Sequence, residues 1–222
     1  MEQRSEEWYA ARLGKVTASR INDVMASGRG GATSLTRQRY QTDLLAERLT
    51  GEITPMPTTA AMEWGTKTEP MARYAYEFLM DEAVTEAPFV PHPSIPDTGA
   101  SPDGLVGETG LIEIKCPNTA THLRHLETGK IERRYMLQMH WQMCCAQKLW
   151  CDFVSFDPRA PDGLKISTTR VARDDELVVE MEAKVKKFIA ELTARETALR
   201  NSNKSRQSLP DMGDIVKLER TE

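Results

Sequence analysis

Prolines and glycines divide residues 83–115 into short extended pieces, and helical patterns stand on both sides of this segment. The pieces fall at 83–90, 98–101, 105–106 and 110–115. Short runs bounded by turn residues predict a meander of strands. Two longer strands are predicted at 150–156 and 164–171. This mixture of helices and strands predicts an α/β or α+β domain.

Capping residues and apolar spacing predict the helices around these strands. The helices cover 5–14, 17–25, 34–51, 59–80, 119–126, 132–148 and 174–200, with Ser5, Thr17 and Ser34 as N-caps of the first three. Pro70 should either kink the fourth helix or mark its true start. The chain beyond Arg200 is polar and irregular, so we expect one domain over residues 1–200 and a tail over residues 201–222.

The charge balance limits the kinds of partner. The 222 residues include 29 Lys+Arg and 33 Asp+Glu, which give a net charge of −4. This balance argues against a protein that coats nucleic acid through bulk charge, but it permits a local basic channel. No apolar run approaches the roughly 20 residues of a membrane span, and the acidic start of the chain is unlike a signal peptide. We therefore expect a cytoplasmic protein with no membrane partner.

Two carboxylates and a lysine mark the most informative stretch, Asp103-Gly104 followed by Glu113-Ile114-Lys115. Because side chains alternate along a strand, Glu113 and Lys115 should share one face while Ile114 points into the core. Gly104 is expected to let the chain turn after Asp103, at the end of the neighbouring strand. The charged groups would then converge, and crowded carboxylates favour a bound Mg²⁺. The arrangement predicts metal-assisted cleavage of a phosphodiester.

The members of this cluster have distinct roles in such a reaction. The carbonyl oxygen of Ile114 would add a metal ligand. Lys115 would help deprotonate the attacking water or stabilise charge on the phosphate. Taken alone, Asp103 before a glycine is also a common turn aspartate. Its combination with Glu113 and Lys115 favours the metal site.

Pro102-Asp103 followed by Glu113-Ile114-Lys115 resembles the PD-(D/E)xK signature of nucleases. Further segments in matching order extend the resemblance to the YqaJ-type viral recombinase family, which includes the bacteriophage lambda exonuclease. The matching segments are Glu7-Trp8 to Thr17-Ala18-Ser19, Glu63-Trp64-Gly65 with Glu69, Ser101 to Leu105, Glu113 to Pro117, and Tyr135-Met136-Leu137-Gln138.

The resemblance implies a restriction-endonuclease-like core, with a central mixed sheet flanked by helices, so that residues 1–200 form a single nuclease domain. The implied activity is a Mg²⁺-dependent 5′-to-3′ exonuclease that processively degrades the 5′-ended strand of linear double-stranded DNA and leaves 3′ overhangs. Two Mg²⁺ ions are implied, with Mn²⁺ able to substitute. The implied partners are 5′-phosphorylated DNA ends, further copies in a homotrimer ring, and a single-strand annealing protein. The gene would belong to a phage or prophage in a bacterial host.

The resemblance also implies three groups of functional residues. The implied metal ligands are Asp103, Glu113, the Ile114 carbonyl and Glu69. Lys115 and Gln138 would serve the attacking water. The terminal 5′-phosphate would be bound by Arg12, Ser19 and Ser101. The sequence pattern agrees in part, because Ser19 falls in the first turn of the helix predicted after Thr17, where free N–H groups attract an anion. Arg12 would reach the phosphate with a bidentate guanidinium. Without the resemblance, Arg12 and Ser19 would be ordinary surface residues.

Plainer alternatives stay open for several of these residues. Glu69, directly before Pro70, fits a first-turn helix acid, and Gln138 fits a surface or core-edge glutamine. Trp8 would pack or stack near the phosphate. A basic cluster includes Arg124, Arg133 and Arg134. These residues either form a solvated surface or contact the phosphates of DNA as the enzyme moves along it.

Two other functions remain as alternatives to the exonuclease. One is a site- or structure-specific DNA endonuclease with the same core, and the other is a catalytically inactive DNA-end-binding module. A 5′-phosphate pocket is useful for starting at an end and unnecessary for internal cutting, which favours the exonuclease. An acidic cluster repels phosphate, so it would not help a protein that only binds DNA.

Overall fold

The computed structural model of the protein describes residues 3–28, 30, 34–54 and 58–205. Its helices are α1 Glu6–Arg12, α2 Ile21–Met25, α3 Leu35–Thr50, α4 Ala60–Met80, α5 Thr119–Thr128, α6 Arg133–Cys145 and α7 Asp175–Ser205, with a 3₁₀ turn at Ala18–Arg20. Its strands are β1 Val16–Thr17, β2 Val84–Thr85, β3 Val90–Pro91, β4 Thr98–Ala100, β5 Gly104–Val106, β6 Gly110–Lys115, β7 Trp150–Phe156 and β8 Ile166–Ala172. The expected mixture of helices and short strands is confirmed. None of the described helices has the length and apolarity that a membrane crossing requires.

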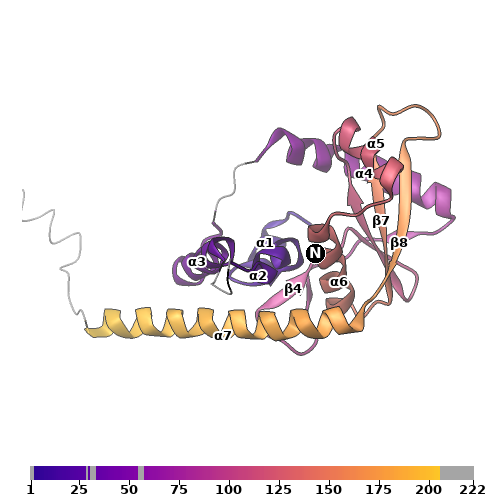
Figure 1. Ribbon diagram of the computed structural model, residues 1–222. Coiled ribbons are helices and arrows are strands. Elements are labelled where there is room, and N and C mark those ends of the chain that lie inside the picture. Colours follow the sequence, from indigo (N-terminus) through magenta and orange to yellow (C-terminus); the bar gives the residue numbers. More distant parts are fainter. Residues whose placement is uncertain (1–2, 29, 31–33, 55–57, 206–222) are drawn as a thin grey trace, which may run out of the picture.

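A mixed sheet with the strand order β2-β5-β6-β7-β8 forms the centre of the molecule. Strands β6 and β7 are parallel, whereas the other neighbours in the sheet are antiparallel. Figure 1 shows this sheet at one end of the molecule, with α4, α5 and α6 around it and the long α7 running away from it toward α3. Strand β6 is therefore an interior strand, covered on both faces.

Side chains of β6 alternate between the two covered faces. Ile112 and Ile114 pack with Tyr76 of α4, whereas Leu111 packs with Met139 of α6. Alternation then places the side chains of residues 113 and 115 on the face toward α6. The predicted burial of Ile114 is confirmed, since its side chain is only 5% exposed.

A second, three-stranded sheet was not predicted. Strand β4 pairs in parallel with β1 and antiparallel with β3, instead of joining the central sheet. Thr17 was expected to cap a helix, but it ends β1, and its side chain makes no capping hydrogen bond. Its backbone N–H donates instead to the hydroxyl of Tyr40 at 3.1 Å. The β1–β4 pairing brings the N-terminal segment beside the chain that leads to Asp103.

The helix predicted over residues 59–80 is confirmed, whereas the last helix is longer than expected. Helix α4 begins at Ala60, where the Thr59 hydroxyl accepts the N–H of Met62 at 3.2 Å, so Pro70 lies inside the helix and does not start it. Helix α7 continues to Ser205, past the point where an irregular tail was expected. Arg200 stabilises this end by donating to the backbone carbonyl of Arg48 in α3. Residues 206–222 of the predicted tail lie outside the described residues.

Gly104 is needed for close packing and not for the predicted turn. It is the first residue of β5, and its φ angle is not positive, so its backbone conformation does not require a glycine. A Cβ atom at this position would collide with the side chain of Val84 on the neighbouring strand β2. The glycine thus allows β2 to lie against β5 directly after Asp103.

Candidate active site

Asp103, Glu113 and Lys115 come together where β5 begins and β6 ends. Asp103 directly precedes β5, and its Oδ2 accepts a hydrogen bond of 2.7 Å from the backbone N–H of Ile114. Glu113 is completely buried, and its Oε1 accepts a hydrogen bond from Nζ of Lys115. The predicted acidic residues and the lysine therefore form one cluster at the edge of the α6 face.

The cluster holds two carboxyl groups and one ammonium group. Burial raises the pKa of the Asp103 carboxyl well above its ordinary value, and the neighbouring Glu113 raises it further. Burial would lower the pKa of Lys115, but Glu113 and Asp103 outweigh it and hold that pKa above its ordinary value. One ammonium group thus faces two crowded carboxylates. Oxygen ligands of this kind fit a hard divalent cation such as Mg²⁺, which would relieve the repulsion.

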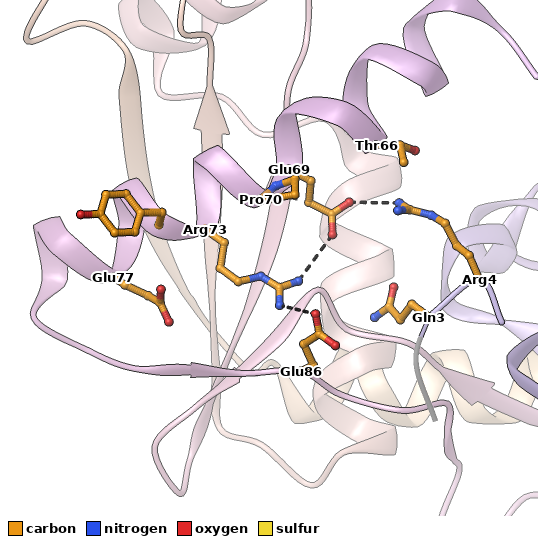
Figure 2. A pocket seen from close by; sticks show the side chains of 9 residues that line it. Gln3, Arg4, Thr66, Glu69, Pro70, Arg73, Glu77 and Glu86 are labelled. Atoms are coloured by element: carbon orange, nitrogen blue, oxygen red, sulfur yellow. Dashed lines mark hydrogen bonds and ion pairs between the residues drawn. The ribbon is translucent and has the colours of Figure 1, made fainter.

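Glu69 lies beside this cluster, on α4, at the wall of a cavity of about 310 Å³. Its Oε2 is 3.1 Å from Nη2 of Arg4, and its Oε1 is 3.6 Å from Nη2 of Arg73. Figure 2 shows both arginines pointing toward Glu69 from different sides. Glu69 is close enough to raise the pKa of Asp103, yet both its oxygens are occupied by arginines. Metal binding would require at least one of these ion pairs to open.

Arg73 connects Glu69 to the cluster, and the sequence alone did not indicate it. Its Nη2 donates a hydrogen bond of 2.8 Å to the backbone carbonyl of Asp103, while its Nη1 pairs with Glu86 at 3.1 Å. The signal available in the sequence was its spacing, because an arginine four residues after Glu69 shares one helical face with it.

Gln138 lies on the face of α6 that is turned toward β6. Tyr135 on this face has its ring 5.1 Å from Nζ of Lys115, and Gln142 donates to Oε2 of Glu113 at 2.6 Å. Positions 135, 138 and 142 follow the spacing of one helical face. Gln138 is half-buried, and within the described ranges its side chain forms no hydrogen bond. It thus shares a helical face with two residues that contact the cluster, but no hydrogen bond joins it to Glu113 or Lys115.

Arg12, Trp8 and Ser101 form a second group close to the first. Nη1 of Arg12 donates to the Ser101 hydroxyl at 3.1 Å, and Nε1 of Trp8 donates to the same oxygen at 2.9 Å. The guanidinium of Arg12 lies 4.0 Å from the centre of the Trp8 ring. Only Pro102 separates Ser101 from Asp103 in the chain.

The guanidinium of Arg12 has no carboxylate in direct contact among the described residues. Burial lowers the pKa of Arg12, and the more distant Glu47, which favours the charged form, does not make up for it. In the part of the chain that the structure describes, Arg12 forms no ion pair. A partly buried guanidinium with a hydroxyl and an indole beside it is a suitable binding site for an anion such as a phosphate.

Ser19 is not brought into contact with this group. Its exposed hydroxyl lies 3.3 Å from that of Thr17 and reaches neither Arg12 nor Ser101. The predicted helix start here is a 3₁₀ turn of three residues followed by the five-residue α2. Such short elements align few peptide dipoles, so the local attraction for an anion is weaker than predicted.

The three predicted DNA-tracking arginines are all exposed, and they differ in their distance from the cluster. Arg134 lies 4.5 Å from the ring of Tyr135 and pairs with Glu132 at 2.8 Å. Tyr135 also faces Lys115, so Arg134 is connected to the cluster through one ring. Arg133 lies near Glu180 of α7, and Arg124 lies on α5.

A further group of metal-binding residue types, His92, Cys144 and Glu182, lies outside this site, with ligand atoms within 4.8 Å of one another. Nδ1 of His92 accepts hydrogen bonds from the backbone N–H groups of Ser94 and Ile95, at 3.2 and 3.1 Å. The proton of the neutral ring is therefore on Nε2, the atom that faces Cys144 and Glu182. A histidine needs a free lone pair to bind a metal, so this group is better suited to hydrogen bonding.

Comparisons with known proteins identify the family of the chain. The YqaJ-like viral recombinase domain family matches residues 7–148. Two crystal structures of the alkaline exonuclease LHK-Exo from Laribacter hongkongensis, one in complex with dAMP, each have 49% identity and a TM-score of 0.84. Each match covers 90% of this chain and 99% of LHK-Exo.

A phage-related exonuclease from Haemophilus somnus 129PT shares the fold, with 16% identity and a TM-score of 0.63 over 82% of this chain and 96% of that chain. No curated protein sequence matches the chain. The resemblance seen in the sequence is thus confirmed by the family match and by the alkaline exonuclease homologue. The chain belongs to the YqaJ-like viral recombinase family.

Proposed function

We propose that the protein is a Mg²⁺-dependent 5′-to-3′ exonuclease that processively degrades the 5′-ended strand of linear double-stranded DNA and leaves 3′ overhangs for phage-type recombination. The observation that carries this proposal is the short connection between an anion site at Arg12 and Ser101 and the cluster at Asp103. A group that recognises a DNA end directly beside a hydrolytic cluster suits removal of terminal nucleotides. The homology to an alkaline exonuclease adds support.

Mg²⁺ would be held by Asp103, Glu113 and the carbonyl oxygen of Ile114, with Glu69 as a further carboxylate once its ion pairs open. When bound, the metal supplies a Lewis acid for the phosphate and the water; two ions are proposed, with Mn²⁺ able to substitute. Lys115 would hold the attacking water beside Glu113 and, once the metal neutralises the carboxylates that keep its pKa high, would help deprotonate it. Gln138 would orient the same water.

The terminal 5′-phosphate would bind to Arg12 and Ser101, with Ser19 as a more distant contact. Trp8 would hold the Arg12 guanidinium in place through its ring and the shared serine hydroxyl. The exposed arginines at 124, 133 and 134 would follow the DNA backbone. We further propose a homotrimer ring and a single-strand annealing partner, as the family resemblance implies; the molar mass in solution tests the ring.

A time course on linear duplex DNA labelled at either end tests this function directly. With Mg²⁺, we expect mononucleotides from the 5′-ended strand and a growing 3′ overhang. Chelation of the metal by EDTA should stop the reaction, because the two carboxylates alone repel phosphate. Closed circular duplex should resist digestion. Cleavage of circles would instead favour the endonuclease, and binding without cleavage would favour the inactive end-binding module.

Arg12→Ala is expected to lower kcat/KM on 5′-phosphorylated ends by about 10- to 100-fold, since it removes a charge-assisted contact with phosphate. Activity on 5′-hydroxyl ends should change little, because that contact is absent there. Initial rates on the two substrates measure the difference. Arg39→Ala, which removes an exposed arginine from α3, is the matched control and should affect neither rate. An equal loss on both kinds of end would contradict the phosphate site.

A further inference from the structure

We propose that Gln142 is a positioning residue that fixes the carboxylate of Glu113 for metal binding. The inference rests on the proposed metal-dependent function and adds to it a residue that neither the sequence motif nor the family resemblance indicated. Nε2 of Gln142 lies 2.6 Å from Oε2 of Glu113, and both side chains are completely buried. The contact joins α6 to the central strand β6, across the face of the sheet that carries the cluster.

The chemistry of the two groups decides how the amide of Gln142 is oriented. An ionised carboxylate only accepts hydrogen bonds, so the NH₂ end of the amide must face Glu113. Oε1 of Gln142 is then directed away, and it is buried without a hydrogen-bond partner among the residues described. A buried carbonyl oxygen without a partner destabilises a fold. Contact with Glu113 accounts for a glutamine here, whereas packing alone does not.

The surroundings of Gln142 support the same conclusion. Its neighbours on α6 include the fully buried Met139 and Met143. A methionine at position 142 would fill a similar volume and bury no polar atom, so an apolar residue would suit the core at least as well. The polar side chain at this point therefore serves Glu113.

Gln142 and Lys115 hold Glu113 in different ways. Lys115 reaches Oε1 with a long side chain that is 27% exposed, and its proposed task is to act on water. Gln142 is confined by the core and has its contact on the other oxygen, Oε2. When Lys115 turns toward the water, Gln142 is the donor that keeps Glu113 in one orientation. Partners of this kind commonly set metal affinity without touching the metal.

The test is the affinity of the DNA-free protein for Mn²⁺, measured by isothermal titration calorimetry on wild type and on Gln142→Met. We expect the variant to bind Mn²⁺ about 10- to 100-fold more weakly. The matched control is Gln41→Met, because Gln41 is a buried glutamine that also donates to a carboxylate, Glu191 at 3.2 Å, far from the cluster. It should bind Mn²⁺ within about twofold of wild type.

Thermal unfolding of each variant separates positioning from a general loss of structure. If Gln142→Met does not fold, Gln142→Ala, which leaves room for water in place of the amide, repeats the titration. Wild-type Mn²⁺ affinity in a folded variant at position 142 would overturn the inference. Failure of the wild-type protein to bind Mn²⁺ or to degrade DNA would instead overturn the proposed function, so the two failures are distinguishable.

Discussion

Lys115→Ala is expected to reduce the rate of DNA cleavage by about 1,000-fold or more while DNA affinity stays within about threefold of wild type. Nζ of Lys115 contacts Glu113 and lies near Tyr135, so the side chain is directed at the cluster and not at the surrounding surface. Its proposed partner in the reaction is water. Single-turnover rates with Mg²⁺ and equilibrium binding with Ca²⁺ measure the two effects separately.

Lys115→Arg tests whether positive charge alone is sufficient. A guanidinium keeps the charge but does not exchange a proton near neutral pH, so this variant should also be nearly inactive. Lys165→Ala is the control, because Lys165 pairs with the exposed Asp162 and has no contact with the cluster. Cleavage at the wild-type rate by Lys115→Ala would remove the lysine from the mechanism. Loss of DNA binding in parallel with cleavage would make it a binding residue.

Asp103→Asn is expected to weaken Mn²⁺ binding strongly and to lower cleavage by about 1,000-fold, because a neutral amide binds a hard cation more weakly than a carboxylate does. The fold should survive, since an asparagine oxygen can still accept the hydrogen bond from the N–H of Ile114. Calorimetric titration with Mn²⁺ and a cleavage assay test both results. Asp162→Asn, a change at an exposed carboxylate, is the matched control.

The same variant should be more stable than wild type when no divalent metal is present. Burial and Glu113 raise the pKa of Asp103, so the ionised carboxylate destabilises the folded protein at pH 8. We expect Asp103→Asn to increase the free energy of unfolding in EDTA by about 1 kcal/mol, since one pKa unit corresponds to about 1.4 kcal/mol. The gain should fade as the pH drops through about 4 and vanish near about 3, where Asp103 is protonated in both the folded and the unfolded state. A loss of stability at pH 8 would contradict this account.

Strand alternation was enough to place much of the cluster. The period of two along residues 110–115 separates Ile114 from Glu113 and Lys115, and this depends only on local backbone geometry. The helix patterns were equally local, so α3 and α4 could be predicted nearly to their ends. Asp103 was expected beside β6, but at the end of a strand with a turn after it; it lies there because it directly precedes β5, the antiparallel neighbour of β6.

What could not be predicted depends on contacts between distant parts of the chain. Two residues, Val16 and Thr17, form β1 only because β4 lies beside them, and no local preference indicates this. The ion pairs of Glu69 involve Arg4, which is 65 positions away. Gln142 is recognisable as a partner of Glu113 only when α6 is packed on the sheet. Tertiary packing, not local propensity, decides these features.

Pro102 fixes the distance between the proposed phosphate site at Ser101 and the cluster at Asp103. It is buried, its ring restricts the backbone, and its carbonyl oxygen is held by the Gln3 side chain at 2.7 Å. The site that would bind the 5′ end of the strand therefore lies at a fixed distance from the site that would cleave it. The length of DNA removed in each cleavage step would then be set by this short piece of backbone. It would be the same at every step and independent of the base sequence.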